Sequence, residues 1–341
     1  MLGKIFLCMN ILIILTYSQI RNEKDFYKYF QKIGEVKLSG KPVINDITSL
    51  DYANNQLLIT DASGKQVVLF NAKTGKLNCI LDVELTTPGF NWLPYGAYFN
   101  KEGIFVANSG PWGYRFFEDG KGRGMMSTKF AGAQCYVFLS NGNIVGWQFR
   151  NDIYLSLMTN TGEEIKRSDK IFFNYPNITY RFMGNDMILD ENDYVYLITC
   201  ADWLIYKYDK NLNFIKKINT KPTYFRKIDR DFKSKDPAEA LMDMKGVVKD
   251  KSTNMNMFYL SKNKILIQYY TAAIKDTPIG ISIIDAEGNK LLEKDILIDK
   301  HIIKAKENKI YFYNQPKWDN VNQPGPVIEI YELKSNSLKK N

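Results

Sequence analysis

The chain has 341 residues, of which 45% are hydrophobic and 24% are charged, and its formal charge is +9. This composition can fill a core, and it excludes intrinsic disorder, collagen-like sequence and a disulfide scaffold. The single histidine, His301, excludes sites that need two imidazoles from one chain, such as a zincin or a two-His-one-carboxylate iron centre. A Ser-His-Asp triad could use only His301. The positive charges are scattered, which does not favour a nucleic-acid partner.

The first 18 residues have the pattern of a secretory signal peptide. Lys4 precedes an apolar run over residues 5–17, and Thr16 and Ser18 supply small side chains at the two positions that a signal peptidase recognises. The run has about 13 residues, which is short for a bilayer span. We therefore expect cleavage after Ser18 and a periplasmic or secreted protein, with membrane association only if this segment is retained.

Three cysteines follow the expected cleavage point, namely Cys79, Cys135 and Cys200. All three lie in apolar runs that resemble strands, and an odd number cannot pair fully. We expect them to be free and buried, where cysteine behaves as a small hydrophobic residue.

Six times after residue 40, a short polar turn is followed by a run of β-branched and aromatic residues, which is typical of a β-strand. The runs begin at Leu57, Ile104, Ile144, Tyr194, Ile265 and Ile310. Counted from Val195 in the fourth run, their spacings are 47, 40, 51, 70 and 45 residues. A period of about 40 to 50 residues built from strands indicates the blades of a β-propeller.

A second hairpin follows most runs, as in Val67–Phe70 and the turn around Gly75. Two hairpins per repeat predict an all-β fold, a six-bladed β-propeller of four-stranded antiparallel blades. Residues 33–38 are available as a closing strand for the last blade. The long fourth spacing predicts an inserted loop or short helix at residues 219–254, between blades 4 and 5. We expect residues 19–33 to form a lead-in, 34–335 the propeller and 336–341 a tail.

The segments 54–61 (Asn-Asn-Gln-Leu-Leu-Ile-Thr-Asp) and 64–77 (Gly-Lys-Gln-Val-Val-Leu-Phe-Asn-Ala-Lys-Thr-Gly-Lys-Leu) resemble a blade of the NHL and YVTN-type propellers found in bacterial exported proteins. The resemblance covers residues 34–335 and implies the architecture only. Blade 2 departs from it, because a glycine-rich stretch stands where the second hairpin should be. Segment 71–76 is also similar to pyrroloquinoline quinone dehydrogenase blades, but Leu77 and Asn78 replace the expected tryptophan.

In such a blade, the loops after the six runs lie on the same face as the connections between blades. Ligands usually bind at that face, and aromatic side chains with basic neighbours suit a peptide, a glycan or an anionic group. The same aromatic residues could instead pack between blades. The predicted ligand-binding residues are Trp92, Trp112, Arg115, Trp147, Arg150, Asp202, Trp203, Tyr270, Lys317 and Trp318.

Two functions fit these patterns. We favour a non-enzymatic, monomeric binding or scaffold propeller that recognises a peptide, a glycan or an envelope protein, without a cofactor. The alternative is a hydrolase with calcium or another divalent cation in the channel, because six-bladed lactonases, which are similar in shape, bind a metal through Glu, Asn and Asp. Asn108, Asp202 and Asp243 could serve in such a site, and Asp61 and His301 are further catalytic candidates. Each of these aspartates could instead cap a loop.

Overall fold

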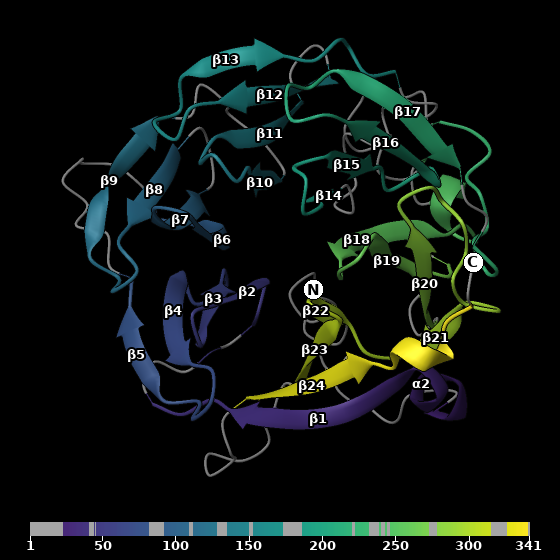
Figure 1. The fold of residues 1–341 in the computed structure, drawn as a ribbon, viewed down its shortest axis with the longest axis horizontal. Coiled ribbons are helices and arrows are strands. Elements are labelled where there is room, and N and C mark those ends of the chain that lie inside the picture. Colours follow the sequence, from purple (N-terminus) through teal and green to yellow (C-terminus); the bar gives the residue numbers. More distant parts are fainter. Residues whose placement is uncertain are drawn as a thin grey trace, which may run out of the picture.

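The chain folds into a closed ring of six β-sheets (Figure 1). This computed structural model describes residues 23–40, 44, 46–81, 92–108, 112–127, 135–149, 153–172, 186–219, 222–231, 239, 243, 246–272, 278–314 and 326–339. Every sheet has four antiparallel strands. The predicted six-bladed, all-β propeller is therefore confirmed.

The blades follow one another in chain order, with the first strand of each nearest the ring axis (Figure 1). Blade 1 contains β2 (Ser49–Ala53), β3 (Gln56–Asp61), β4 (Gln66–Asn71) and β5 (Leu77–Ile80). Blade 2 contains β6 (Pro94–Asn100), β7 (Gly103–Asn108), β8 (Trp112–Phe116) and β9 (Gly122–Ser127). Blade 3 contains β10 (Tyr136–Phe138), β11 (Ile144–Phe149), β12 (Ile153–Met158) and β13 (Glu164–Arg167).

Blade 4 contains β14 (Asp186–Leu189), β15 (Val195–Ile198), β16 (Leu204–Tyr208) and β17 (Phe214–Asn219). Blade 5 contains β18 (Thr253–Tyr259), β19 (Lys264–Tyr270), β20 (Ile279–Asp285) and β21 (Ile296–Ile298). Blade 6 contains β22 (Ile302–Lys306), β23 (Lys309–Asn314) and β24 (Val327–Leu333), and its outer strand is β1 (Phe30–Lys37). The helix α2 (Glu23–Tyr29) precedes β1, and a short 3-10 helix, η1 (Ser335–Ser337), follows β24.

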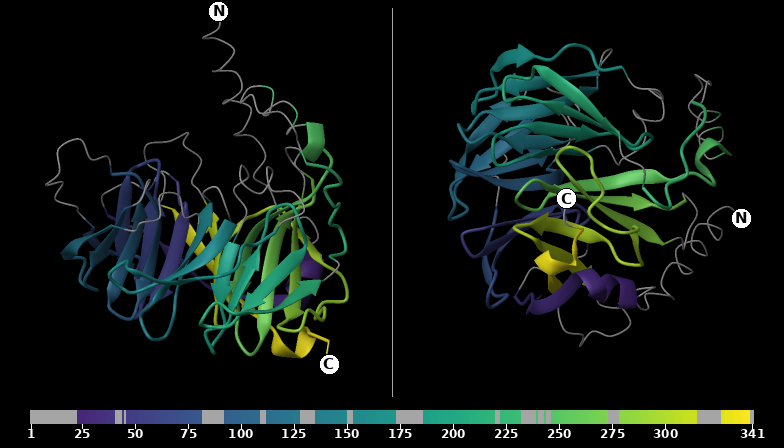
Figure 2. Two further views of the ribbon diagram at one scale, coloured as in Figure 1. Left: turned by 90° about the horizontal axis from the view of Figure 1, so that it is seen from above. Right: turned by 45° about the vertical axis from the view of Figure 1, so that its right-hand side comes forward.

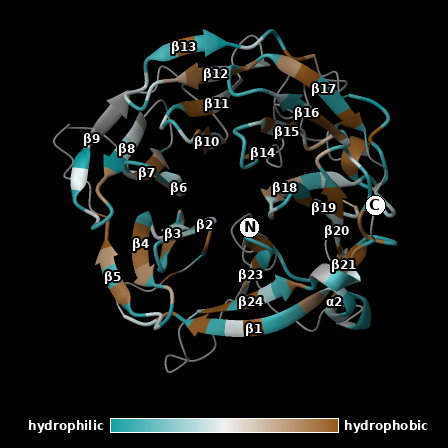
Figure 3. Cartoon of the chain, viewed as in Figure 1, coloured by the Kyte–Doolittle hydropathy of each residue, from teal (hydrophilic) through white to brown (hydrophobic). Residues whose placement is uncertain are grey.

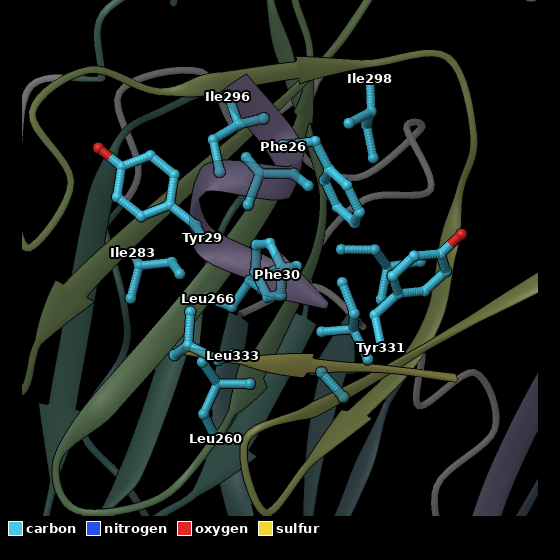
Figure 4. Packing of buried hydrophobic residues seen from close by; sticks show 14 of the residues in the cluster. Phe26, Tyr29, Phe30, Leu260, Leu266, Ile283, Ile296, Ile298, Tyr331 and Leu333 are labelled. Atoms are coloured by element: carbon cyan, nitrogen blue, oxygen red, sulfur yellow. The ribbon is translucent and has the colours of Figure 1, made fainter. Parts of the chain in front are cut away.

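The ring closes by pairing its two ends. β1 pairs antiparallel with β24 from Phe30 opposite Leu333 to Lys37 opposite Val327. The closing strand predicted at residues 33–38 is thus present and begins three residues earlier. α2 adds aromatic side chains under this closure, where Phe26 stacks on Phe30 with ring centroids 5.0 Å apart (Figure 4). Both rings are fully buried against blades 5 and 6.

The six predicted runs form the second strands of the blades, which are the most continuously buried strands. In β3, for example, the five residues after Gln56 are all buried. Each second strand packs on both neighbouring blades, so both of its faces are apolar, as its near-continuous hydrophobic sequence requires. The outermost strands are more exposed, as β17 shows, and Figure 3 shows hydrophilic and hydrophobic residues mixed along this strand.

The glycine-rich stretch of blade 2, which departs from the family pattern, nevertheless forms a hairpin. β8 and β9 pair from Trp112 opposite Ser127 to Phe116 opposite Gly122. Gly120 has φ +87°, a left-handed conformation in the turn that glycine adopts without strain. The insertion between β17 and β18 includes helical residues at 239, 243 and 246–248, in agreement with the predicted loop and short helix.

The strands run between two faces of a disc (Figure 2). One face carries the connections between blades and the loops between second and third strands, and we call it the loop face. The other carries the turns between first and second strands and between third and fourth strands, and we call it the turn face. No helix among the described residues is long and apolar enough to span a membrane. Cys79, Cys135 and Cys200 form no disulfide with one another; Cys135 and Cys200 are buried, whereas Cys79 is partly exposed.

Candidate functional site

The loop face brings together two of the residues singled out in the sequence, Tyr270 and His301. Tyr270 ends β19 and His301 directly precedes β22, so blades 5 and 6 supply one ring each. The rings meet edge to face with centroids 5.7 Å apart. Tyr270 is 36% exposed. His301 is also exposed, and the partial burial of its ring lowers its pKa below the ordinary value.

The predicted tryptophan residues do not form one exposed surface. Trp147 lies within β11, fully buried between blades 3 and 4. Trp203 is buried between Phe225 and Tyr269, with ring centroids 5.1 and 5.3 Å away. Trp92 is partly buried and packs edge to face on Tyr114. Trp147 and Trp203 are therefore not available to contact a ligand in this structure, because burial between blades removes their large apolar rings from water.

The other predicted binding residues are separated from one another. Asp202 is buried, and its Oδ1 accepts the backbone N–H of Trp203 at 3.0 Å. Arg115 lies within β8 and lines a crevice between blades 2 and 3 near the turn face. Arg150, Lys317, Trp318 and the side chain of Trp112 lie outside the described residues.

Two polar candidates from the loops after the runs hold those loops in place. Asp61 is fully buried, and its Oδ1 accepts the backbone N–H of Gly64 at 2.8 Å and that of Asp46 at 3.3 Å. Asn108 is also buried, and its Oδ1 accepts the backbone N–H of Leu93 at 2.6 Å. Both side chains satisfy backbone donors that would otherwise be left unpaired in a loop.

A second group of functional side chains lies around the ring axis, on the innermost strands. The strand registers place Asp51, Tyr98 and Lys304 at equivalent positions in blades 1, 2 and 6. Each pairs with a second-strand residue that packs toward the next blade, namely Leu58, Phe105 and Tyr311. Asp186 of blade 4 lies two residues closer to the loop face than this shared position, level with Ser49 of blade 1. We call Asp51, Tyr98, Asp186 and Lys304 the axial cluster.

One ion pair lies within the axial cluster. Lys304 Nζ lies 2.7 Å from Asp51 Oδ1, and both side chains are largely buried. Lys304 also lowers the pKa of Asp186 through its charge, although burial outweighs this effect and raises that pKa to about 6. Burial raises the pKa of Tyr98 well above its ordinary value, and Cys135 and Asp186 add to the shift. The cluster thus contains two carboxyl groups and one ammonium group in a poorly solvated position.

Both axial carboxylates also join neighbouring blades. Asp51 Oδ2 accepts the backbone N–H of Phe99 in blade 2 at 2.8 Å, and Asp186 Oδ2 accepts that of Met257 in blade 5 at 2.7 Å. In each case Oδ1 accepts the N–H of the following residue. These carboxylates therefore fix the spacing of innermost strands, and any chemistry at the axis would use groups already committed to backbone donors.

The sequence analysis missed the axial cluster, although a spacing signal was present. Asp51, Tyr98 and Lys304 each stand six residues before the first residue of their run, at Leu57, Ile104 and Ile310. Tyr259 stands at the same offset before Ile265, and a polar residue at that offset in four of six repeats could have indicated a shared position.

The residues considered for a divalent cation are not brought together by an observed contact. Asn108 and Asp202 hold backbone groups, and Asp243 faces Arg230 at 3.8 Å. In the described ranges, no group of three or more His, Cys, Asp or Glu side chains could hold a metal ion.

This geometry defines a six-bladed β-propeller with a polar axis and an aromatic pair on its loop face. No family model matches the chain, and no curated protein matches it. Among solved structures, it is similar to an exported protein of Bacteroides fragilis, with a TM-score of 0.64, 11% identity and coverage of 93% of this chain and 98% of the other.

A member of the DUF4221 family from Bacteroides vulgatus has a TM-score of 0.63 at 10% identity, with 90% and 99% coverage. A catalytically inactive variant of virginiamycin B lyase from Staphylococcus aureus, solved with quinupristin, has a TM-score of 0.50 at 12% identity, with 87% and 83% coverage. These similarities show the shared fold.

Proposed function

We propose that this chain is an exported, non-enzymatic propeller that binds a peptide, a glycan or an envelope protein on its loop face. The observation that carries the proposal is the contrast between the axial carboxylates and the Tyr270–His301 pair. Asp51 and Asp186 are committed to backbone N–H groups of neighbouring blades, whereas the two rings stand exposed on the loop face.

An exposed aromatic pair suits recognition better than fold stability. A tyrosine ring gives a flat apolar surface with a hydroxyl group at its edge, and such side chains concentrate binding energy at protein surfaces. His301 adds a ring that can donate or accept a hydrogen bond. Trp92, Trp112, Arg150, Lys317 and Trp318 stay in this proposal as further contacts, whereas Trp147 and Trp203 are left out because they are buried.

Export fits the proposal through the first 18 residues, whose pattern is that of a signal peptide, and through the fold shared with an exported protein of Bacteroides fragilis. Membership in the NHL or YVTN-like group is part of the same proposal and rests on the blade segments at 54–77. We expect a periplasmic or secreted protein that acts as a monomer and needs no cofactor.

A photo-crosslinking experiment tests the loop face directly. A benzoylphenylalanine is placed at position 270, and a matched control carries it at position 214, where Phe214 is 50% exposed on the outermost strand β17. Irradiation in cells should give one defined adduct from position 270 and none of the same mass from position 214. Identical adduct patterns from the two positions would contradict the proposal.

Two measurements distinguish the binding function from the alternative, a hydrolase with calcium or another divalent cation. Metal analysis of purified protein should show no stoichiometric ion, and calcium should not raise the melting temperature. Hydrolysis of ester or lactone substrates that is lost on chelation and on Asp186→Asn substitution would replace the binding function with the enzymatic one.

A further inference from the structure

We propose that the crevice between blades 2 and 3 is a second binding site, separate from the loop face, and that it binds a carboxylate group through Arg115. The crevice lies near the turn face, is narrow and opens to solvent at its mouth. The residues that carry the argument are Arg115, Arg123, Glu102 and Asn160, together with the rings of Phe105 and Phe116.

Arg115 stands at a position that is apolar in most blades. The position is defined by strand register: in every blade, the central residue of the second strand that faces the next blade has one partner on the third strand. These third-strand residues are Leu69, Arg115, Leu157, Lys207, Ile283 and Ile330. Four of the six are aliphatic, as the packed interface between blades requires. A guanidinium at this position therefore calls for a specific explanation.

Lys207, the other charged residue at this position, has aromatic partners for its ammonium group, whereas Arg115 does not among the described residues. Lys207 Nζ lies over the rings of Tyr194 and Tyr196, 4.4 and 5.0 Å from their centroids. Arg115 has no ion pair or cation–π contact with the described residues. Its Nε is buried without a hydrogen-bond partner there. A buried guanidinium N–H without an acceptor is costly, and an anion bound at Arg115 would remove that cost.

The carboxylate of Glu102, which also lines the crevice, is already engaged. Glu102 Oε2 lies 3.2 Å from Arg123 Nη1, and Glu102 Oε1 accepts a hydrogen bond from Asn160 Nδ2. Arg123 Nη1 also donates to the carbonyl oxygen of Glu102 at 2.9 Å. Among the described residues, two guanidinium groups and one carboxylate therefore line the crevice, which leaves one positive charge, that of Arg115, without a counter-charge in this set.

The shape and charge of the crevice favour a carboxylate. The planar fork of arginine matches the two oxygens of a carboxylate in a bidentate pair, and a single uncompensated charge matches a monoanion better than a phosphate dianion. Phe105 and Phe116 line the apolar side of the crevice but are almost fully buried, so a ligand would be held mainly through its carboxylate. A free organic acid and the C-terminus of a peptide share this chemistry.

The test measures the binding of benzoate by NMR titration at low ionic strength. Wild-type protein and the control Lys207→Leu should bind benzoate equally, whereas Arg115→Leu should weaken binding at least about tenfold. Arg115→Leu should also melt no lower than wild type, since leucine occupies the same position in blades 1 and 3. Arg115→Lys, which keeps the charge and loses the planar fork, should show intermediate affinity.

Further arms identify the source and class of the anion. The tripeptide Gly-Gly-Phe is titrated alongside its C-terminal amide, which lacks the carboxylate. If the tripeptide with a free carboxylate binds more tightly than benzoate, the ligand is a peptide C-terminus. If benzoate binds more tightly than the tripeptide, the ligand is a free organic acid. Equal benzoate affinity in wild type and Arg115→Leu would overturn the site. Tighter binding of inorganic phosphate than of benzoate, if lost in Arg115→Leu, would overturn the carboxylate assignment. Neither result depends on the crosslinking outcome at Tyr270.

Discussion

Two aspartates near the ring axis serve the structure of the ring, and one of them, Asp186, also has a pKa raised to about 6. Asp51 and Asp186 each accept two backbone N–H groups, one of them from the next blade. Asp51 also has the ammonium group of Lys304 at 2.7 Å, whereas no cation among the described residues forms an ion pair with Asp186. Burial therefore dominates at Asp186 and raises its pKa to about 6.

The raised pKa predicts that Asp186 makes folding less favourable as the pH rises. The folded protein holds this proton up to a pH of about 6, but the unfolded chain loses it near 3.8, so stability falls between these two values. The full shift corresponds to about 3 kcal/mol. Asp186→Asn, which cannot ionise, should not lose this stability.

Urea unfolding of wild type and Asp186→Asn at pH 4 and pH 7 measures the effect. The wild type should lose up to about 3 kcal/mol relative to the variant between the two values. The comparison uses the change with pH, so any constant offset from the altered hydrogen bonds cancels. Equal pH dependence in both proteins would show that Asp186 ionises with an ordinary pKa.

At the scale of elements, strand identity could be predicted from sequence, whereas the direction of single side chains could not. The runs of β-branched and aromatic residues indicated the second strands correctly because these strands are buried on both faces. Trp147 was assigned to a loop, but β11 continues to Phe149, so strand alternation directs the ring toward blade 4.

The same reasoning explains why the candidate sites were predicted only in part. The crevice depends on Arg115 facing Glu102 and Asn160, which come from different turns of two blades. The axial cluster depends on registers that align residues from blades 1, 2, 4 and 6. Composition and periodicity describe single strands, and relations between blades arise only when the ring closes.

The closing element, α2 with β1, gives a prediction about packing. Phe30 is fully buried in the cluster shown in Figure 4, whereas Ile33 in the same strand is 45% exposed. Phe30→Ala should lower the free energy of unfolding by about 3 to 5 kcal/mol, because it removes a ring and leaves a cavity. Ile33→Ala should change it by less than about 1 kcal/mol. Chemical unfolding of both variants measures the difference, and equal losses would contradict the assigned burial.

At the scale of the whole molecule, the ring depends on residues near the start of the chain. β1 covers the edge of β24, and an uncovered edge strand offers unpaired backbone groups to other molecules. The predicted signal cleavage after Ser18 lies before Glu23, where α2 begins, so cleavage there would leave the closing strand intact.

A pair of truncations tests this dependence. A protein that begins at Gln19 should be folded and monomeric in size-exclusion chromatography, whereas one that begins at Ser39 should aggregate, because β24 loses its partner and the core loses Phe26 and Phe30. A peptide of residues 19–38 should restore the monomer by pairing with β24, and the same peptide with Phe30→Ala should restore it less well. If the protein that begins at Ser39 is monomeric with an unchanged melting temperature, β1 does not close the ring in solution.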